Sequence, residues 1–147
     1  MRNVAADLCT LIAAGTSYVG GVNLFAGRLP SQRRDEVVWV TEDLSAIEPF
    51  IGSQDAVTVT CNVSIRGEAG RQDDGLRARA FDVLAAVHRA DASPYVSIVA
   101  TSLPDLEEDQ ADKPVYTFSV DCTFRMESIG PLVILPPDGP LEVEALR

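Results

Sequence analysis

A strictly alternating stretch near the middle of the chain constrains the fold more than any other feature. Apolar and polar side chains alternate one for one from residue 57 to residue 66. Successive side chains of a β-strand point to opposite faces, so this pattern predicts a strand with one apolar face and one face open to water. The apolar positions are Val57, Val59, Cys61, Val63 and Ile65.

The segment that follows predicts a helix that covers the apolar face. From Asp73 onward, apolar side chains recur at spacings of three and four, which places them on one stripe of a helix. Asp73 and Asp74 suit the helix start, where carboxylates accept hydrogen bonds from orphan N–H groups. Ser93-Pro94 is expected to end the helix, and residues 95–100 predict the next strand. The expected stripe consists of Leu76, Ala80, Val83, Leu84 and Val87.

The N-terminal third predicts a second helix and two short strands. Apolar residues from Val4 to Ile12 recur at helical spacing, with Asn3 as the N-cap and Gly15 as the stop. Residues 20–30 have a strand-like centre, and residues 36–41 predict a short strand that pairs with it. Residues 42–54 show no clear period and are expected to form a connection with one helical turn near Ser45.

The last third predicts a long acidic loop and then a long strand. Residues 103–114 are rich in Asp and Glu, whereas residues 116–127 show the longest alternation in the chain. The alternation predicts an antiparallel strand whose polar face is open to water or to a neighbour. The sequence thus predicts an α+β domain over residues 1–127, with a mixed, mostly antiparallel sheet of about five strands and two helices on one face. The positions expected to face the helices are Val57, Val59, Val63, Ile65, Phe118, Val120 and Phe124.

Composition excludes several classes of protein. A net charge of −10 argues against a protein that grips nucleic acid, which needs a basic surface, but allows one past which nucleic acid slides. The three cysteines, Cys9, Cys61 and Cys122, occupy apolar positions and are expected to be buried free thiols. No apolar run approaches the ~20 residues that span a bilayer. The N-terminus has no signal-peptide pattern, so we expect an intracellular origin.

No motif in the sequence indicates catalysis. His88 is the single histidine, and no nucleophile or orienting partner accompanies it, so we expect a histidine on a helix surface. The acidic run that contains Glu107 and Glu108 lacks the ligand pattern of a calcium loop and is expected to be solvated. Arg28, Arg33 and Arg34 form a local basic cluster that contacts either phosphate or acidic groups of a neighbour. We therefore predict no catalytic residue, no metal site and no cofactor.

Residues 128–147 form a proline-rich C-terminal arm. Four prolines bracket or follow the apolar run from Leu132 to Leu135, and proline at this density does not extend a central strand. The run either folds back on its own domain or docks on another subunit, and we expect the second. The candidate residues for contact with other subunits or partners are Arg28, Arg33, Arg34, Trp39, Glu107, Glu108, Leu132, Val133, Ile134 and Leu135.

The stretch Asn23-Leu24-Phe25-Ala26-Gly27-Arg28-Leu29-Pro30 resembles one found in minor capsid or tail terminator proteins of tailed bacteriophages. In that family an Asn-Leu-Phe-x-Gly-x-Leu-Pro stretch follows a short N-terminal helix. The similarity in the order and spacing of elements extends over residues 3–127 and includes Ile65-Arg66-Gly67 at the end of a strand. The arginine-rich loop 31–35 and the C-terminal arm depart from the family pattern.

The resemblance implies a structural virion protein that forms a ring, usually of six copies. Such a ring caps the tail tube, joins it to the head or neck, and surrounds the channel through which DNA passes. The implied partners are copies of the same chain, the tail tube protein and a head–tail connector, with DNA only as passing cargo and no membrane. Assembly would take place in the cytoplasm of the bacterial host. The alternative is a small cytosolic α+β module that binds a ligand or regulates a partner, which would be a monomer or dimer.

Overall fold

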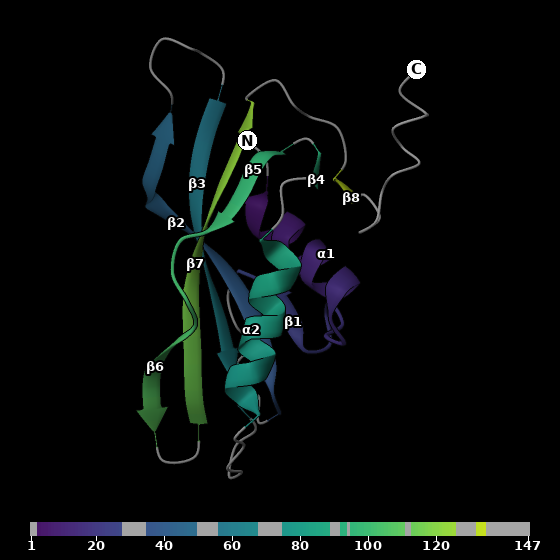
Figure 1. The fold of residues 1–147 in the computed structure, drawn as a ribbon, viewed down its shortest axis with the longest axis vertical. Helices are drawn as coiled ribbons and strands as arrows, with labels where there is room; N and C mark the ends of the chain where they lie inside the picture. The colour runs from purple at the N-terminus through teal and green to yellow at the C-terminus, as the bar shows by residue number, and fades with distance from the viewer. Residues whose placement is uncertain are drawn as a thin grey trace.

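A twisted sheet of six strands carries two helices on one face (Figure 1). A computed structural model describes residues 3–27, 35–49, 56–67, 75–88, 92–93, 95–110, 113–125 and 132–134. The fold is α+β, as the sequence predicts. The elements in chain order are α1 (Val4–Gly15), β1 (Leu24–Ala26), β2 (Val37–Pro49), β3 (Ala56–Arg66), α2 (Leu76–Val87), β4 (Ala92–Ser93), β5 (Tyr95–Ala100), β6 (Asp105–Gln110), β7 (Lys113–Arg125) and β8 (Val133–Ile134).

The sheet is mostly antiparallel, and its longest strands lie at its centre. The strand order is β1-β2-β3-β7-β5, and β6 also pairs with β7. Only β1 and β2 are parallel among these pairs. The β3–β7 ladder runs without a break from Ala56 opposite Arg125 to Arg66 opposite Val115. Because β7 lies between β3 and β5, the connection through α2 crosses over one strand position.

The predicted core positions all lie under the helices. Each of the seven positions expected to face the helices is at most 3% exposed, so the predicted phase of both long strands is confirmed. Five α1 side chains and the predicted α2 stripe, except the half-buried Leu84, are buried against them. The two buried sets are Val4, Ala5, Leu8, Leu11 and Ile12 of α1, and Leu76, Ala80, Val83 and Val87 of α2.

The N-terminal end of α1 is held by two side chains, Asn3 and Glu42. Asn3 is the N-cap, as predicted, and its side chain accepts a hydrogen bond from the Ala6 N–H at 3.1 Å. Glu42 of β2 accepts the N–H groups of Val4 (2.8 Å) and Ala5 (3.2 Å), which places a carboxylate at the positive end of the helix dipole. Gly15 is the last helical residue rather than the residue after the helix.

Three predicted boundaries are wrong. The strand β2 continues to Pro49 where a connection was expected, because a register shift between Asp43 and Glu48 breaks the alternation that identifies a strand. The acidic segment forms β6 rather than a loop, since it pairs along the edge of β7 and pairing outweighs the low strand propensity of acidic residues. The helix α2 ends at Val87, and Ala92–Ser93 forms β4.

The described part of the C-terminal arm folds back on its own domain. Val133 and Ile134 of β8 pair antiparallel with Ser93 and Ala92 of β4. Leu132 and Ile134 are half-buried and pack against the core. The structure therefore contradicts our expectation that residues 132–134 leave the domain, because these apolar side chains cover core residues of their own chain. Leu135 and the rest of the arm lie outside the described residues.

Candidate functional site

The face of the sheet opposite the helices carries an ordered set of polar pairs, and we call it the open face. Each polar side chain of β3 on this face, from Thr58 to Ser64, bonds to its cross-strand neighbour on β7. Because donors and acceptors satisfy one another, the face presents few unmet groups for recognition of a specific ligand. The pairs are Thr58–Thr123 (2.8 Å), Thr60–Asp121 (2.7 Å), Asn62–Ser119 (2.9 Å) and Ser64–Thr117 (3.1 Å).

One row across the open face begins with two aromatic residues at the β1 side and ends with an acidic residue on β6. Trp39 of β2 is opposite Phe25 of β1 and Ser64 of β3, and both aromatic side chains are half-buried. The same row continues through Thr117 of β7 to Asp105 of β6. Trp39, a residue selected from the sequence, therefore belongs to this face, whereas its pairing with Phe25 emerges only from the strand register.

The acidic charges of the open face lie near its centre, and two arginines lie toward the ends of the β3–β7 ladder. Asp43 and Asp121 lie in one row, on either side of Thr60. Arg66 and Arg125 lie at opposite ends of the β3–β7 ladder. The middle of the open face is thus acidic and polar, which does not suit tight binding of a polyphosphate backbone.

The Asn-Leu-Phe-x-Gly stretch has a structural role that holds β1 on β2. The Asn23 side chain accepts the Val19 N–H at 2.7 Å, and Leu24 is buried in the core. Gly27 has φ +92°, a conformation that favours glycine, and its N–H donates to the Val40 carbonyl at 2.6 Å. These residue types are therefore explained by the turn and the strand that they form.

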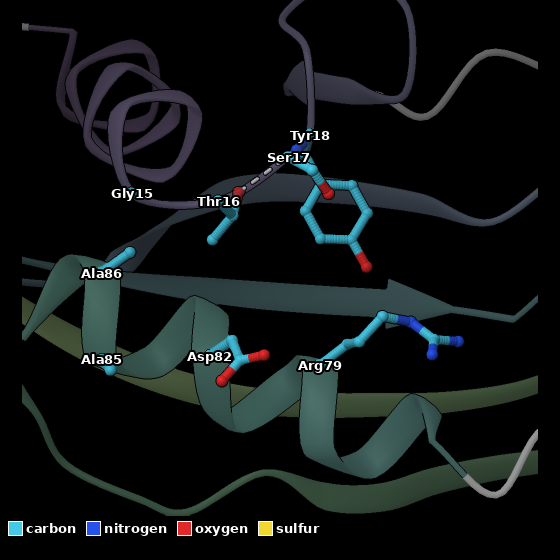
Figure 2. Close-up of a pocket in the computed structure, with 8 residues that line it drawn as sticks. All are labelled: Gly15, Thr16, Ser17, Tyr18, Arg79, Asp82, Ala85 and Ala86. Atoms are coloured by element: carbon cyan, nitrogen blue, oxygen red, sulfur yellow. Dashed lines mark hydrogen bonds between the residues drawn. The ribbon is translucent and has the colours of Figure 1, made fainter.

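A cleft of about 580 Å³ lies between the end of α1, the loop after it and α2. In Figure 2, Tyr18 projects from the loop toward the side on which Arg79 extends from α2, and Asp82 lies beside them. Gly15 and Ala86, two of the residues that line the cleft, are in close contact. A Cβ atom added to Gly15 would lie only 2.9 Å from the Ala86 Cβ. The close approach of the two helices thus leaves an open polar cleft beside their contact.

The carboxylate of Glu36 organises this cleft. It accepts a hydrogen bond from the Tyr18 hydroxyl, and it accepts two from Arg79, Nε at 2.9 Å and Nη2 at 2.7 Å. Burial and the hydrogen bond to Glu36 raise the pKa of Tyr18 above its usual range. Tyr18 is therefore protonated at neutral pH and acts as a donor, so the cleft offers polar contacts to a small molecule but no activated nucleophile among the residues described.

The single histidine, His88, joins the end of α2 to the end of β5. His88 is exposed at the C-terminal cap of α2, as expected, and its Nδ1 accepts the Ala100 N–H at 3.0 Å. It borders a cavity of about 340 Å³ together with Leu84 and the turn from Ala100 to Leu103. Thr101 and Ser102 also line this cavity, and both hydroxyl groups bond to the backbone of Ser119: Thr101 donates to its carbonyl at 3.3 Å, and Ser102 accepts its N–H at 2.9 Å. These contacts, like that of His88, hold the turn against β7.

The three thiols converge in the core although they are far apart in the sequence. Cys61 and Cys122 are buried on the same face of the paired strands β3 and β7, and Cys9 of α1 packs against this core. Burial raises the pKa of Cys9 to about 12, and the contact with Cys61, together with burial, raises the pKa of Cys122. Cys9 and Cys122 are therefore protonated at neutral pH and hence weakly reactive. No group of three or more potential metal ligands occurs in the described part of the chain.

The candidates selected from the sequence do not form one cluster among the residues described. Trp39 lies on β2, whereas Glu107 and Glu108 lie on β6, beyond β3 and β7. Val133 lies in β8, between the core-packed Leu132 and Ile134. Arg28, Arg33, Arg34 and Leu135 lie outside the described residues.

No helix among the described residues is long and apolar enough to cross a bilayer. Among known proteins, no family model matches the chain and a search of curated proteins gave no match.

Proposed function

We propose that this protein is a structural subunit of a bacteriophage tail or neck, similar to a tail terminator. Six copies would form a ring that caps the tail tube and joins it to the head, with DNA passing through the centre. The protein would act in the virion, after assembly in the host cytoplasm, and would carry no catalytic activity.

The open face is the observation that carries this proposal. A sheet covered by helices on one side leaves the other side to water or to neighbouring molecules. Here the polar side chains of β3 and β7 on that side are hydrogen-bonded to one another, and Asp43 and Asp121 make its centre acidic. Such a surface suits the wall of a channel, because it repels phosphate and has few unmet donors that would retain DNA.

The order of elements supports the same proposal. An N-terminal helix, the strand of the Asn-Leu-Phe stretch, a strand that ends at Arg66-Gly67, a second helix and a final long strand follow one another as the resemblance implies. The elements β4, β6 and β8 are additions to that order. A second candidate function, a small-ligand module, is favoured by the 580 Å³ cleft beside Tyr18 and Arg79.

Assembly state separates the two candidates. The purified full chain is examined by native mass spectrometry over a wide concentration range, alone and with the tail tube protein encoded near it. The proposal expects a discrete cyclic oligomer of six copies, or rings at tube ends in electron micrographs. A chain that stays monomeric or dimeric in both settings contradicts it, and stabilisation of that chain by a small molecule would favour the ligand module.

A further inference from the structure

Asp82 is an unpaired carboxylate in the cleft between α1 and α2. It lies among the residues that line the cleft, and its side chain is exposed. Within the part of the chain that the structure describes, it has no hydrogen-bond or ion-pair partner. Arg79 lies three residues earlier on the same helix, at a spacing where opposite charges attract each other. Asp82 is therefore unpaired although a cation is within reach along its own helix.

Glu36 explains why Arg79 does not pair with Asp82. Its carboxylate accepts hydrogen bonds from Nε of Arg79 at 2.9 Å and from Nη2 at 2.7 Å, and a two-fold contact of this kind fixes a guanidinium firmly. Figure 2 shows the Arg79 side chain extending away from Asp82. The charges of Glu36 and Arg79 offset each other. The lining of the cleft is left with one uncompensated negative charge, that of Asp82.

The end of α1 adds negative potential to the same cleft. Gly15, the last residue of α1, lines the cleft together with Thr16 and Ser17. The C-terminal end of a helix carries a partial negative charge, and the last turn of α1 contains no basic residue that would offset it. The helix end and Asp82 belong to different elements, and both attract a cation.

The other walls of the cleft suit an aliphatic chain. The Tyr18 side chain is buried, and it borders the cleft together with the methyl groups of Ala85 and Ala86 (Figure 2). A volume of about 580 Å³ lies within the range of cavities that hold small molecules. A metal ion fits less well, because Ca²⁺ takes roughly six to eight oxygen ligands and the cleft supplies one carboxylate that is not already engaged.

We infer that this cleft binds an aliphatic amine in its ammonium form. The ammonium group lies between Asp82 and the end of α1, and the alkyl chain lies along Ala85 and Ala86 toward Tyr18. An alkylamine is protonated at neutral pH, as a lysine side chain is. This inference goes beyond the proposed structural role and does not depend on it, because the cleft lies in the helix layer and the proposed channel wall is the open face.

Three probes with the same carbon chain test the sign of the charge. The full chain, labelled with ¹⁵N, is titrated at pH 7 and low salt with n-butylamine, 1-butanol and butyrate, which are cationic, neutral and anionic. Nuclear magnetic resonance is suitable because it detects the weak binding expected of one exposed ion pair. Butylamine should shift the backbone amide signals of residues 15–18 and 82–86 in a saturable way. Equal shifts with butanol or butyrate would overturn the inference.

Asp82→Asn tests the carboxylate, with Asp105→Asn as its matched control. Both variants change the net charge by one unit, and Asp105 is an exposed residue of β6 outside the cleft. Asp82→Asn should raise the dissociation constant for butylamine at least about fivefold, whereas Asp105→Asn should leave it unchanged. Equal effects of the two variants would mean that butylamine responds only to the overall negative charge of the chain, and would overturn the inference.

A cation supplied by the chain itself should occupy the site. Ala85 is exposed and lies three residues after Asp82, so Ala85→Lys places an ammonium group beside the carboxylate. This variant should lose butylamine binding, whereas Ala85→Met, with a neutral side chain of similar length, should retain it. Circular dichroism checks that both variants are folded. Equal loss in the two would show that shape rather than charge governs the cleft, and would contradict an ammonium site.

The oligomeric state of the same samples separates this inference from the proposed function. A chain that forms rings but gives no saturable response to butylamine rejects the amine site and leaves the ring as a proposal. A chain that stays monomeric, alone and with tail tubes, but binds butylamine at Asp82 rejects the ring and supports the amine site.

Discussion

Phe118 contributes to the packing between the sheet and its two helices. Its side chain is 1% exposed, on the helix-covered face of β7. Phe118→Ala removes a large buried side chain and should lower the free energy of unfolding by about 3–5 kcal/mol, since the cavity does not collapse fully. Urea denaturation followed by circular dichroism measures the change.

The next residue supplies the control for this substitution. Ser119 points to the open face, where its hydroxyl donates to the Asn62 side chain at 2.9 Å. Ser119→Ala should cost only about 1 kcal/mol, because a partly exposed hydrogen bond contributes little after exchange with water. Equal losses for the two variants would contradict the assignment of the two faces.

Three groups with raised pKa values, Cys9, Tyr18 and Cys122, make stability depend on pH in the alkaline range. Burial raises the pKa of Cys9 from 9.0 to about 12, and the pKa values of Tyr18 and Cys122 are raised as well. Below the usual pKa both the folded and the unfolded chain hold these protons, so their contribution is complete. As the pH rises above about 9, the unfolded chain loses protons that the folded chain retains, and stability falls.

Urea midpoints between about pH 8 and about pH 11 test this dependence. The midpoint should decrease steadily, and Cys9→Ala should reduce the decrease, because one of the titrating groups is gone. A thiol reagent at pH 8 should label the unfolded chain at three sites and the folded chain slowly. A midpoint that is constant across this range would contradict the burial of these groups.

The pair β4–β8 is the element that ties the arm to the domain. Leu132 and Ile134 pack against the core as half-buried side chains. A chain that ends after Gly130 loses both, and should lose about 1.5–3 kcal/mol of stability from the apolar area that becomes exposed. A chain that ends after Leu135 keeps both and should unfold at the midpoint of the full chain. Thermal unfolding of the two truncations measures the difference, and a Gly130 truncation as stable as the Leu135 truncation would show that β8 adds nothing.

Elements with an unbroken period could be predicted from the sequence, and elements defined by pairing could not. The strand β3, the helix α2 and the strand β7 each show one period over many residues, so their faces were predicted correctly. The strand β6 forms from acidic residues because β7 offers an edge, and no local pattern records that edge. The β2 extension was missed because its register shift hides the alternation.

The candidate site also combines a residue that could be selected from the sequence with features that depend on strand pairing. Trp39 could be selected as a half-exposed aromatic residue, but the polar ladder beside it depends on which side chains of β3 and β7 are opposite each other. The convergence of the thiols is also non-local, since Cys61 and Cys122 lie on strands separated by α2 and three further strands in the chain. Spacing rules for cysteine motifs apply to neighbours in sequence and do not detect such a group.

If the whole molecule forms part of a DNA channel, its surface must not bind DNA tightly. The net charge is −10, and the open face is acidic at its centre. We expect the folded chain not to retard duplex DNA in a gel at about 0.15 M salt, because few phosphate counterions would be released. A basic DNA-binding protein of similar size serves as the positive control. Retardation that weakens as salt rises would mean that the chain grips DNA, and would contradict a channel wall.

The central position of β7 has a consequence for synthesis of the protein on the ribosome. This strand is the last long one to be translated, yet it lies between β3 and β5 and is opposite residues of β3, β5 and β6. A nascent chain that ends before Lys113 has two helices and several strands but no central strand on which to assemble them. Long-range pairing of this kind delays folding until the chain is nearly complete. The nascent protein therefore exposes its apolar strands for most of its synthesis and depends on the final residues of β7 to bury them in one step.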